Sequence, residues 1–293
     1  MKQQLAPILI LFAAMLWGTT GTVQALAPDS AHPVAIGAAR LFIGGLFLLI
    51  ILLLSGKLDL SKIPVKATIT AAICIGVYQP LFFSAVEITG VAIGTVVAIG
   101  SAPVLAGMIE MLFLKKKPAR IWWISTILSI AGVILLFSNQ GSVQADPVGI
   151  LLALSAGLAF SAYTTVNKEV VVSMSPLPAV AVVFTLSGIL LSPFLFILDM
   201  SWIFTVEGMI TGLHLGVIAT GIAYYLFATG LFKVSSSTAV TLSLAEPLTA
   251  TMLGVFFLGE HMSLPSWAGL ILMLFGIGVL ILSARKPRPV ITK

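Results

Sequence analysis

Charged residues are scarce in this sequence, and their scarcity decides the class of protein. Asp, Glu, Lys and Arg account for 9% of the 293 residues, whereas apolar residues account for 59% and the mean hydropathy is +1.16. An average soluble domain carries roughly 25% charged residues, and no water-soluble fold of this length can bury so many apolar side chains. We therefore expect them to face the hydrocarbon of a lipid bilayer, which excludes a soluble enzyme.

Cysteine and histidine are too few to build a metal centre. The single cysteine, Cys74, excludes an intramolecular disulfide and a cysteine cluster for zinc or iron–sulfur ligation. The three histidines, His32, His214 and His261, are scattered and form no metal motif. We accordingly predict no metal and no cofactor. The net charge of +5 does not indicate nucleic acid either, because the basic residues sit in short connections between apolar runs rather than along one face.

Long apolar runs are abundant. A spanning helix needs about 20 mostly apolar residues, and the runs here are continuous and rich in Leu and Ile, rather than alternating as in a β-barrel. The sequence predicts an all-α integral membrane protein with ten transmembrane helices. We place the helices at 5–27, 34–54, 67–87, 91–114, 121–138, 147–168, 177–198, 208–230, 236–258 and 266–283.

The connections between these runs differ in charge. All basic residues except Arg40, which lies inside the second run, fall in alternate connections or at the chain ends, and the other connections hold acids. Cytoplasmic loops carry an excess of Lys and Arg, so we predict a multi-pass protein of the inner (plasma) membrane with both termini cytoplasmic. The basic residues on the predicted cytoplasmic side are Lys2, Lys57, Lys62, Lys66, Lys115, Lys116, Lys117, Arg120, Lys168, Lys233, Arg285, Lys286, Arg288 and Lys293; the acids opposite include Asp29, Asp146, Asp199, Glu207 and Glu260.

The second half of the chain repeats the first. A shift of 143 residues places Trp17 on Phe160, Pro33 on Pro176 and Gly45 on Gly188, and a shift of 144 places Phe83 on Phe227, Pro103 on Pro247, Trp123 on Trp267 and Gly132 on Gly276. Five helices per copy is an odd number, so the second copy enters the membrane from the opposite side, as in the inverted repeats of secondary transporters. We predict repeats at 1–138 and 147–283, a linker at 139–146 and a basic cytoplasmic tail at 284–293.

Short motifs in a fixed order carry a family resemblance. They are Leu16-Trp17-Gly18-Thr19, Ala39-Arg40, and Glu246-Pro247 followed by Leu258-Gly259-Glu260. With the five-plus-five repeat, the chain resembles the ten-helix EamA branch of the drug/metabolite transporter superfamily over essentially its whole length. The resemblance implies a bacterial inner-membrane carrier of small metabolites, often an exporter of amino acids or related compounds. The chain departs from the usual pattern after the fourth run, where Lys115 and Lys116 replace Gly-Glu.

Several aromatic and polar residues fall near the middle of the predicted bilayer. Trp17, Tyr78, Ser101, Phe160 and Glu246 each lie about 15 to 20 Å from a membrane face at 1.5 Å rise per residue. We predict that these residues, with the neighbouring Gln79 and Tyr163, form the substrate site. Pro80, Pro103 and Pro247 are expected helix breaks, because proline removes a backbone donor; each break serves either helix packing or the site.

Two helices carry matching polar stripes. Trp17, Thr20, Gly21 and Gln24 share one helical face, and the shift of 143 places them on Phe160, Tyr163, Thr164 and Asn167. Because the repeats are inverted, Gln24 and Asn167 are expected to line the outer and the inner vestibule; interhelical hydrogen bonding is the alternative. Of the adjacent Tyr224 and Tyr225, one is predicted to gate the inner vestibule and the other to join the interfacial belt; we take Tyr224 as the gate residue.

Ionisable residues inside the membrane point to function by default. Arg40 is interpreted as a vestibule residue or a structural counter-ion, and His214 as a hydrogen-bonded structural residue. We expect Glu110, about one turn from Lys115, to anchor the helix end at the interface. Glu246 is the acid at the midplane, so we assign it to coupling or to a substrate ammonium group; the alternative is a hydrogen bond to the carbonyl freed by Pro247.

These observations favour a secondary transporter that binds a small-molecule substrate and works by alternating access. Because no ATP-binding motif is present, uphill transport needs protons or a counter-substrate. The alternatives are a membrane-embedded lipid-processing enzyme and a channel. Paired carboxylates, His-x-x-x-His, Gly-x-Ser-x-Gly and phosphate-loop motifs, which such an enzyme needs, are missing from the sequence, so we predict that the protein is not an enzyme.

The charge distribution gives a testable topology. Reporter fusions after Lys62 and after Gly141 are expected to give opposite localisation signals, with the Lys62 fusion cytoplasmic, because an odd number of spans separates them. Alkaline phosphatase and green fluorescent protein fusions measure the two sides independently. Matching signals from the two sites would contradict the inverted repeat.

Overall fold

A computed structural model describes residues 5–28, 30–57, 59–138, 146–258 and 262–284 of the protein. Within these ranges ten helical spans are long and apolar enough to cross a membrane, and no residue is in a strand. The predicted fold class, an all-α membrane protein, is therefore confirmed. The predicted linker and basic tail lie outside the described residues except for Asp146 and Ala284, as do Lys2, Asp29, Gly141, Glu260 and the basic residues from Arg285 to Lys293.

The first half contains four long helical elements. They are α1 (Ala6–Ala25), α2 (Pro33–Ser55), α3 (Val65–Phe113) and α4 (Arg120–Phe137), with a short 3-10 turn at Leu60–Lys62. The element α3 contains two spans, Val65–Gly90 and Ile93–Phe113. They meet at Gly90, whose φ of 81° and ψ of 159° are non-helical. A glycine adopts this left-handed φ without a Cβ clash, so the chain reverses there with little strain.

The second half is more broken. Its first two spans are α5 (Pro147–Met174) and α6 (Pro176–Leu191) with the short α7 (Phe194–Ile197). After the 3-10 turn Ser201–Phe204, the next span joins α8 (Val206–Leu213), the π-helical segment His214–Ile222 and α9 (Ala223–Leu231). The last two spans are α10 (Ser236–Leu242) with α11 (Ala245–Leu258), and α12 (Leu264–Ala284).

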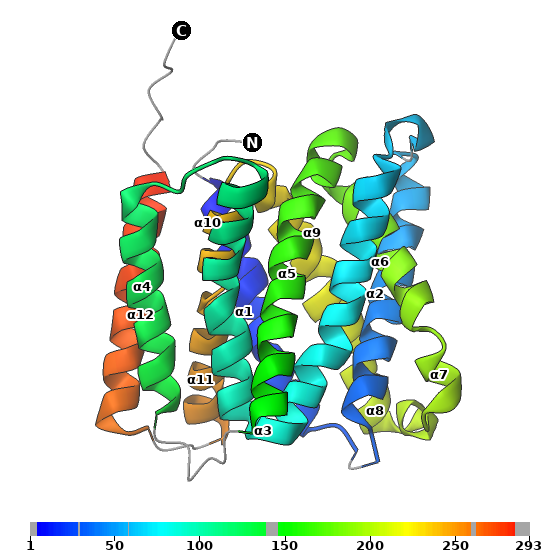
Figure 1. The fold of residues 1–293 in the computed structure, drawn as a ribbon. Coiled ribbons are helices and arrows are strands. Elements are labelled where there is room, and N and C mark those ends of the chain that lie inside the picture. The colour runs from blue at the N-terminus through cyan, green and yellow to red at the C-terminus, as the bar shows by residue number, and fades with distance from the viewer. Residues whose placement is uncertain (1–4, 29, 58, 139–145, 259–261, 285–293) are drawn as a thin grey trace, which may run out of the picture.

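The helices stand side by side, and their ends define two faces. We call the face where α1 begins and α12 ends the terminal face; it is at the top of Figure 1, and the other is the opposite face. The described basic residues outside Arg40 belong to the terminal-face ends and connections, whereas Asp146, Asp199 and Glu207 lie at the opposite face. The charge separation expected from the sequence is thus present in the fold.

Glycine contacts reproduce the repeat in three dimensions. We call two residues that the repeat shift places on each other mates. A Cβ at Gly45 of α2 would lie 2.6 Å from the Phe184 carbonyl of α6, and one at its mate Gly188 would lie 3.1 Å from the Leu41 carbonyl of α2. Gly132 of α4 and its mate Gly276 of α12 show the same pattern. A Cβ at Gly132 would lie 2.6 Å from the Gly269 carbonyl of α12, and one at Gly276 would lie 2.9 Å from the Ser125 carbonyl of α4. Each half therefore packs mainly against the other half, through small residues that let helix backbones approach in lipid.

The proline predictions had mixed outcomes. The helix α3 continues through Pro80 and Pro103, so the expected breaks at these two residues are not seen; its interruption at Gly90 lies in the connection expected between the runs at 67–87 and 91–114. A proline removes one backbone hydrogen bond, which a transmembrane helix held by its neighbours tolerates. Near Pro247 the helix does break: α10 ends at Leu242 and α11 begins at Ala245.

The α2–α6 contact can be tested by adding a methyl group. We expect Gly45→Ala to lower the free energy of unfolding by about 1 to 3 kcal/mol, because the new Cβ overlaps the Phe184 backbone. The control is Gly278→Ala, where no atom lies within 4 Å of the added Cβ and a helix-favouring residue costs nothing. Thermal unfolding in detergent measures both variants. Equal stability of the two would contradict the close approach of α2 and α6.

Candidate functional site

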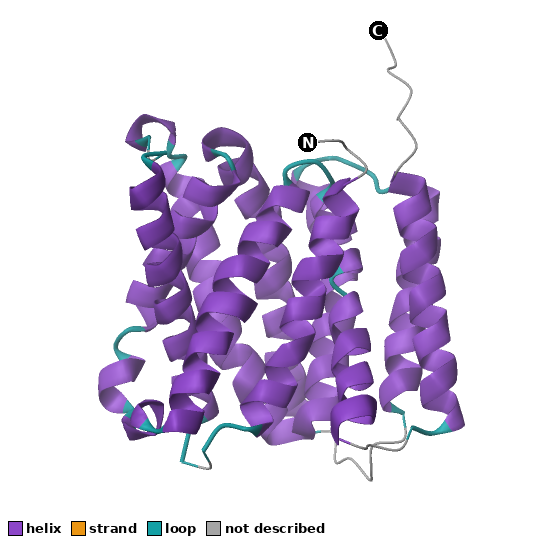
Figure 2. Cartoon of the chain, turned by 180° about the vertical axis from the view of Figure 1, so that it is seen from behind, coloured by secondary structure: helices purple, strands orange, loops and turns teal. Residues whose placement is uncertain are grey.

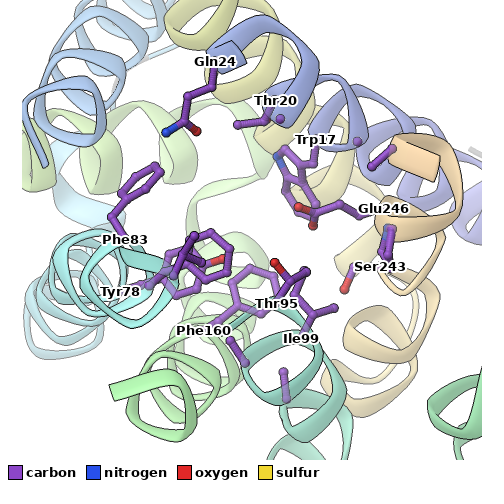
Figure 3. A pocket seen from close by; sticks show the side chains of 18 of the residues that line it. Trp17, Thr20, Gln24, Tyr78, Phe83, Thr95, Ile99, Phe160, Ser243 and Glu246 are labelled. Carbon is purple, nitrogen blue, oxygen red and sulfur yellow. The ribbon is translucent and has the colours of Figure 1, made fainter. Parts of the chain in front are cut away.

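A cavity of about 600 Å³ lies between the two halves. Its walls come from both repeats, chiefly α1, the two spans of α3, and α11 (Figure 3). The lining residues Gln24, Val86 and Gly254 belong to the opposite-face ends of their spans. The cavity therefore extends from the middle of the membrane toward the opposite face.

Aromatic rings close the deep end of the cavity, and we call Trp17, Tyr78, Phe160 and Tyr224 the aromatic floor. The Trp17 ring centroid lies 5.9 Å from that of Phe160 and 4.7 Å from that of Tyr224, and the Tyr78 and Phe160 centroids are 5.6 Å apart. Such tilted and edge-on contacts are favourable for aromatic pairs. The structure thus brings together Trp17, Tyr78 and Phe160, which were predicted at the midplane, and Tyr224, which was predicted as a gate of the inner vestibule.

Glu246 points into this cavity (Figure 3). It is the second residue of α11, directly after the break between α10 and α11. The described residues give its carboxyl group no hydrogen bond or ion pair. The carbonyl of Ser243, which Pro247 leaves without its usual helical donor, accepts instead from the backbone N–H of Glu246 at 2.9 Å. The structural role that we considered for the Glu246 side chain is therefore performed by its backbone.

Arg40 lines the same cavity and is also held in place. Its Nε donates to Thr220 Oγ1 at 3.1 Å, and an Nη donates to the Ala219 carbonyl at 3.5 Å. Both partners belong to the π-helical segment, where Thr220 Oγ1 also donates to the Leu215 carbonyl. A π-bulge re-aims side chains and often marks a functional position. Among the described lining residues, Arg40 and Glu246 are the charged ones.

Unpaired donors add polarity to the walls. Trp17 Nε1, Gln79 Nε2 and the Thr20 hydroxyl are buried without a hydrogen-bond partner in the described part of the chain, a costly state unless water or a ligand reaches them. Sequence reasoning did not select Thr95 or Ser243, which also line the cavity. The signal for Ser243 was available, because it lies four residues before Pro247 and so carries the carbonyl which that proline frees.

Some predicted site residues lie outside the cavity. Ser101 packs against Gly157 of α5, and its neighbour Ala102 lines the cavity in its place. Tyr163 is fully buried, and its hydroxyl accepts from Asn167 Nδ2 at 3.2 Å. Asn167 is also fully buried, on the terminal-face side. The vestibule residues are therefore unequal in this state: Gln24 lines an open space, whereas Asn167 is enclosed.

Two ionisable residues outside the cavity have defined partners. His214 Nε2 lies 2.8 Å from Thr19 Oγ1, the structural hydrogen bond that we expected. The expectation that Glu110 anchors the helix end at the interface is wrong. Glu110 is 4% exposed, and its carboxylate accepts hydrogen bonds from the first residues of α10. Helical phase explains the difference, because Glu110 faces α10 rather than the lipid.

The chain is similar to proteins named as transporters over nearly its whole length. The sequence profile described as the EamA-like transporter family matches residues 4–138 and 147–282. The uncharacterized transporter YwfM of Bacillus subtilis (strain 168) is 51% identical, over 98% of this chain and 97% of that protein. The uncharacterized inner membrane transporter YicL of Salmonella typhimurium is 24% identical, over 94% and 95% of the two chains. One solved crystal structure superposes with a TM-score of 0.82 at 19% identity, covering 96% of this chain and 97% of the other, which shows a shared fold.

The one-sided opening of the cavity is testable with single cysteines in a Cys74→Ala background. Thr95 lines the cavity, whereas Ala239, its mate under the shift of 144, is fully buried near the terminal face. We expect a water-soluble maleimide to label Thr95→Cys at least about tenfold faster than Ala239→Cys in nanodiscs, since thiol reactivity follows exposure. Equal labelling rates would contradict the one-sided cavity.

Proposed function

We propose, from the premise that the chain belongs to the EamA-like transporter family, that it moves a small metabolite across the inner membrane by alternating access. The family match covers both halves of the chain and supports a transporter in a lipid bilayer. The inverted packing of α2 with α6 and of α4 with α12 supports the mechanism, because two related halves can exchange conformations around a central site. The two halves of the chain that would exchange conformations are the repeats 1–138 and 147–283.

The observation that carries the substrate class is Glu246, an acid without a described partner in the same cavity as Arg40. A buried, unpaired charge is expensive in a membrane, and a ligand of opposite charge removes that cost. A cation at Glu246 and an anion at Arg40 correspond to the ammonium and carboxylate of an amino acid or a related compound. The aromatic floor would accept an apolar side chain, and about 600 Å³ is a usual size for a small-molecule site.

We propose export, the direction that the resemblance to EamA carriers implies. Basic residues gather at the terminal face, which supports cytoplasmic termini and an opposite face that is external. The cavity then opens to the outside, the state in which an exporter releases its substrate and takes up a proton or a counter-substrate. Glu246 is the group proposed to bind that proton; the charged and titratable groups near it on the cavity walls are Arg40, Tyr78 and Tyr224.

The Glu246→Gln variant tests the role of the acid, because glutamine keeps the size and hydrogen bonding of glutamate but does not titrate. Uptake of radiolabelled amino acids, each tested singly in proteoliposomes, is measured with a pH gradient and as exchange without one. We expect at least about a tenfold loss of gradient-driven uptake, corresponding to about 1.4 kcal/mol of lost interaction. Loss of gradient-driven uptake alone supports proton coupling, and loss of exchange as well supports pairing with the substrate ammonium.

The matched control is Glu87→Gln, which makes the same chemical change at an exposed position near the opposite face. Its uptake is expected to equal that of the unmodified protein. Full activity of Glu246→Gln at every pH would exclude both roles for Glu246. If no amino acid is transported by the unmodified protein, the proposed substrate class is wrong.

A further inference from the structure

The short connection between α9 and α10 is held by a buried carboxylate at one end. Glu110 Oε1 accepts from the backbone N–H of Ser236 at 2.7 Å and of Ser237 at 3.3 Å, and Oε2 accepts from the Ser237 hydroxyl at 2.6 Å. Hydrogen bonds to a carboxylate are stronger than those between neutral groups. Three bonds therefore tie the start of α10 to the end of α3.

A lysine holds the other end of the same connection. Lys168 of α5 donates through Nζ to the Leu231 carbonyl at 2.7 Å and also to the Val234 carbonyl. These carbonyls lie at the end of α9 and just beyond it, where the helix leaves them without an intrahelical donor. The connection at 232–235 is thus fixed by α3 on one side and by α5 on the other. We call Glu110 and Lys168, with these five hydrogen bonds, the latch.

The latch has no counterpart in the other repeat. The shift of 144 places Glu110 on Gly254, and the shift of 143 places Lys168 on Ala25. Neither replacement has a side chain that forms hydrogen bonds. Gly254 lines the cavity at its open end. The latch thus lies in the half of the membrane near the terminal face, which is closed, and the half that contains the cavity lacks a latch.

The residues behind the latch are the mates of the residues that line the cavity. Thr20, Gln24, Thr95 and Ala250 are partly exposed and line the open cavity. Their mates Tyr163, Asn167, Ala239 and Ala106 are fully buried. In an inverted repeat, the cavity of the alternate state forms among these mates. They lie on α3, α5 and α10, the elements that the latch connects, so the alternate cavity cannot form until the latch separates.

We propose that Glu110 and Lys168 act as a one-sided latch that closes the terminal-face gate and makes the state open to the opposite face the resting state. This inference rests on the proposed alternating access. The latch hydrogen bonds exist in one of the two states, and an interaction made in one state shifts the equilibrium toward it. The latch acts on the gate and not on the substrate, which binds at the aromatic floor and Glu246.

Cysteine labelling tests the latch without any substrate. Thr95→Cys and Ala239→Cys, each in the Cys74→Ala background, report the open cavity and its closed counterpart. We expect Glu110→Ala to raise the maleimide labelling rate of Ala239→Cys at least about tenfold and to lower that of Thr95→Cys, because three hydrogen bonds of the resting state are lost. Lys168→Met is expected to act in the same direction.

The controls are Glu169→Ala and Lys66→Met, which remove the same charges at exposed positions of α5 and α3; they are expected to leave both rates unchanged. Glu110→Gln, which can still pair with the Ser236 N–H and the Ser237 hydroxyl, should have a smaller effect and serves if Glu110→Ala does not fold. Unchanged labelling of Ala239→Cys in every folded latch variant would overturn the latch. That result would not affect the proposed transport function. Conversely, a protein whose labelling rates change as expected but which transports no amino acid would overturn the proposed function and not the latch.

Discussion

The absence of water in the bilayer core is the constraint on which this structure depends. Every backbone N–H and C=O must be satisfied inside the protein, so the chain crosses the membrane as helices and can interrupt them in few places. Gly90 interrupts α3 at the opposite face. The break between α10 and α11 lies beside the cavity, where Ser243 and Glu246 form its wall. Irregular backbone thus occurs next to a cavity or at a membrane face.

The same constraint explains how the halves are joined. Because lipid gives no hydrophobic drive for helices to associate, close packing has to supply the attraction. Glycines at related positions in the two copies allow this close packing: Gly45 and its mate Gly188, and Gly132 and its mate Gly276. The contacts link one half to the other, so the halves share one packed structure.

The two halves differ most in their buried polar groups. The first half contributes Arg40 to the cavity, and the second contributes Glu246 and the π-helical segment that holds Arg40. On the terminal-face side, Glu110 and Lys168 make hydrogen bonds that Gly254 and Ala25 cannot repeat. The glycine packing is therefore related between the two halves, whereas the buried polar contacts are not.

The sequence by itself determined the class of fold, because long apolar runs and the repeat of Trp17, Gly45 and Pro103 in the second half depend on composition and order alone. It also selected the midplane part of the cavity wall, since the depth of Trp17, Tyr78, Phe160 and Glu246 follows from the rise of a helix. Only the tertiary structure decided which way each side chain faces. It placed Glu110 against α10 rather than toward lipid, enclosed Tyr163 and Asn167, and kept α3 helical through Pro80 and Pro103. Depth is a property of one helix, whereas the direction of a side chain and the side on which the cavity lies depend on contacts with residues distant in the chain.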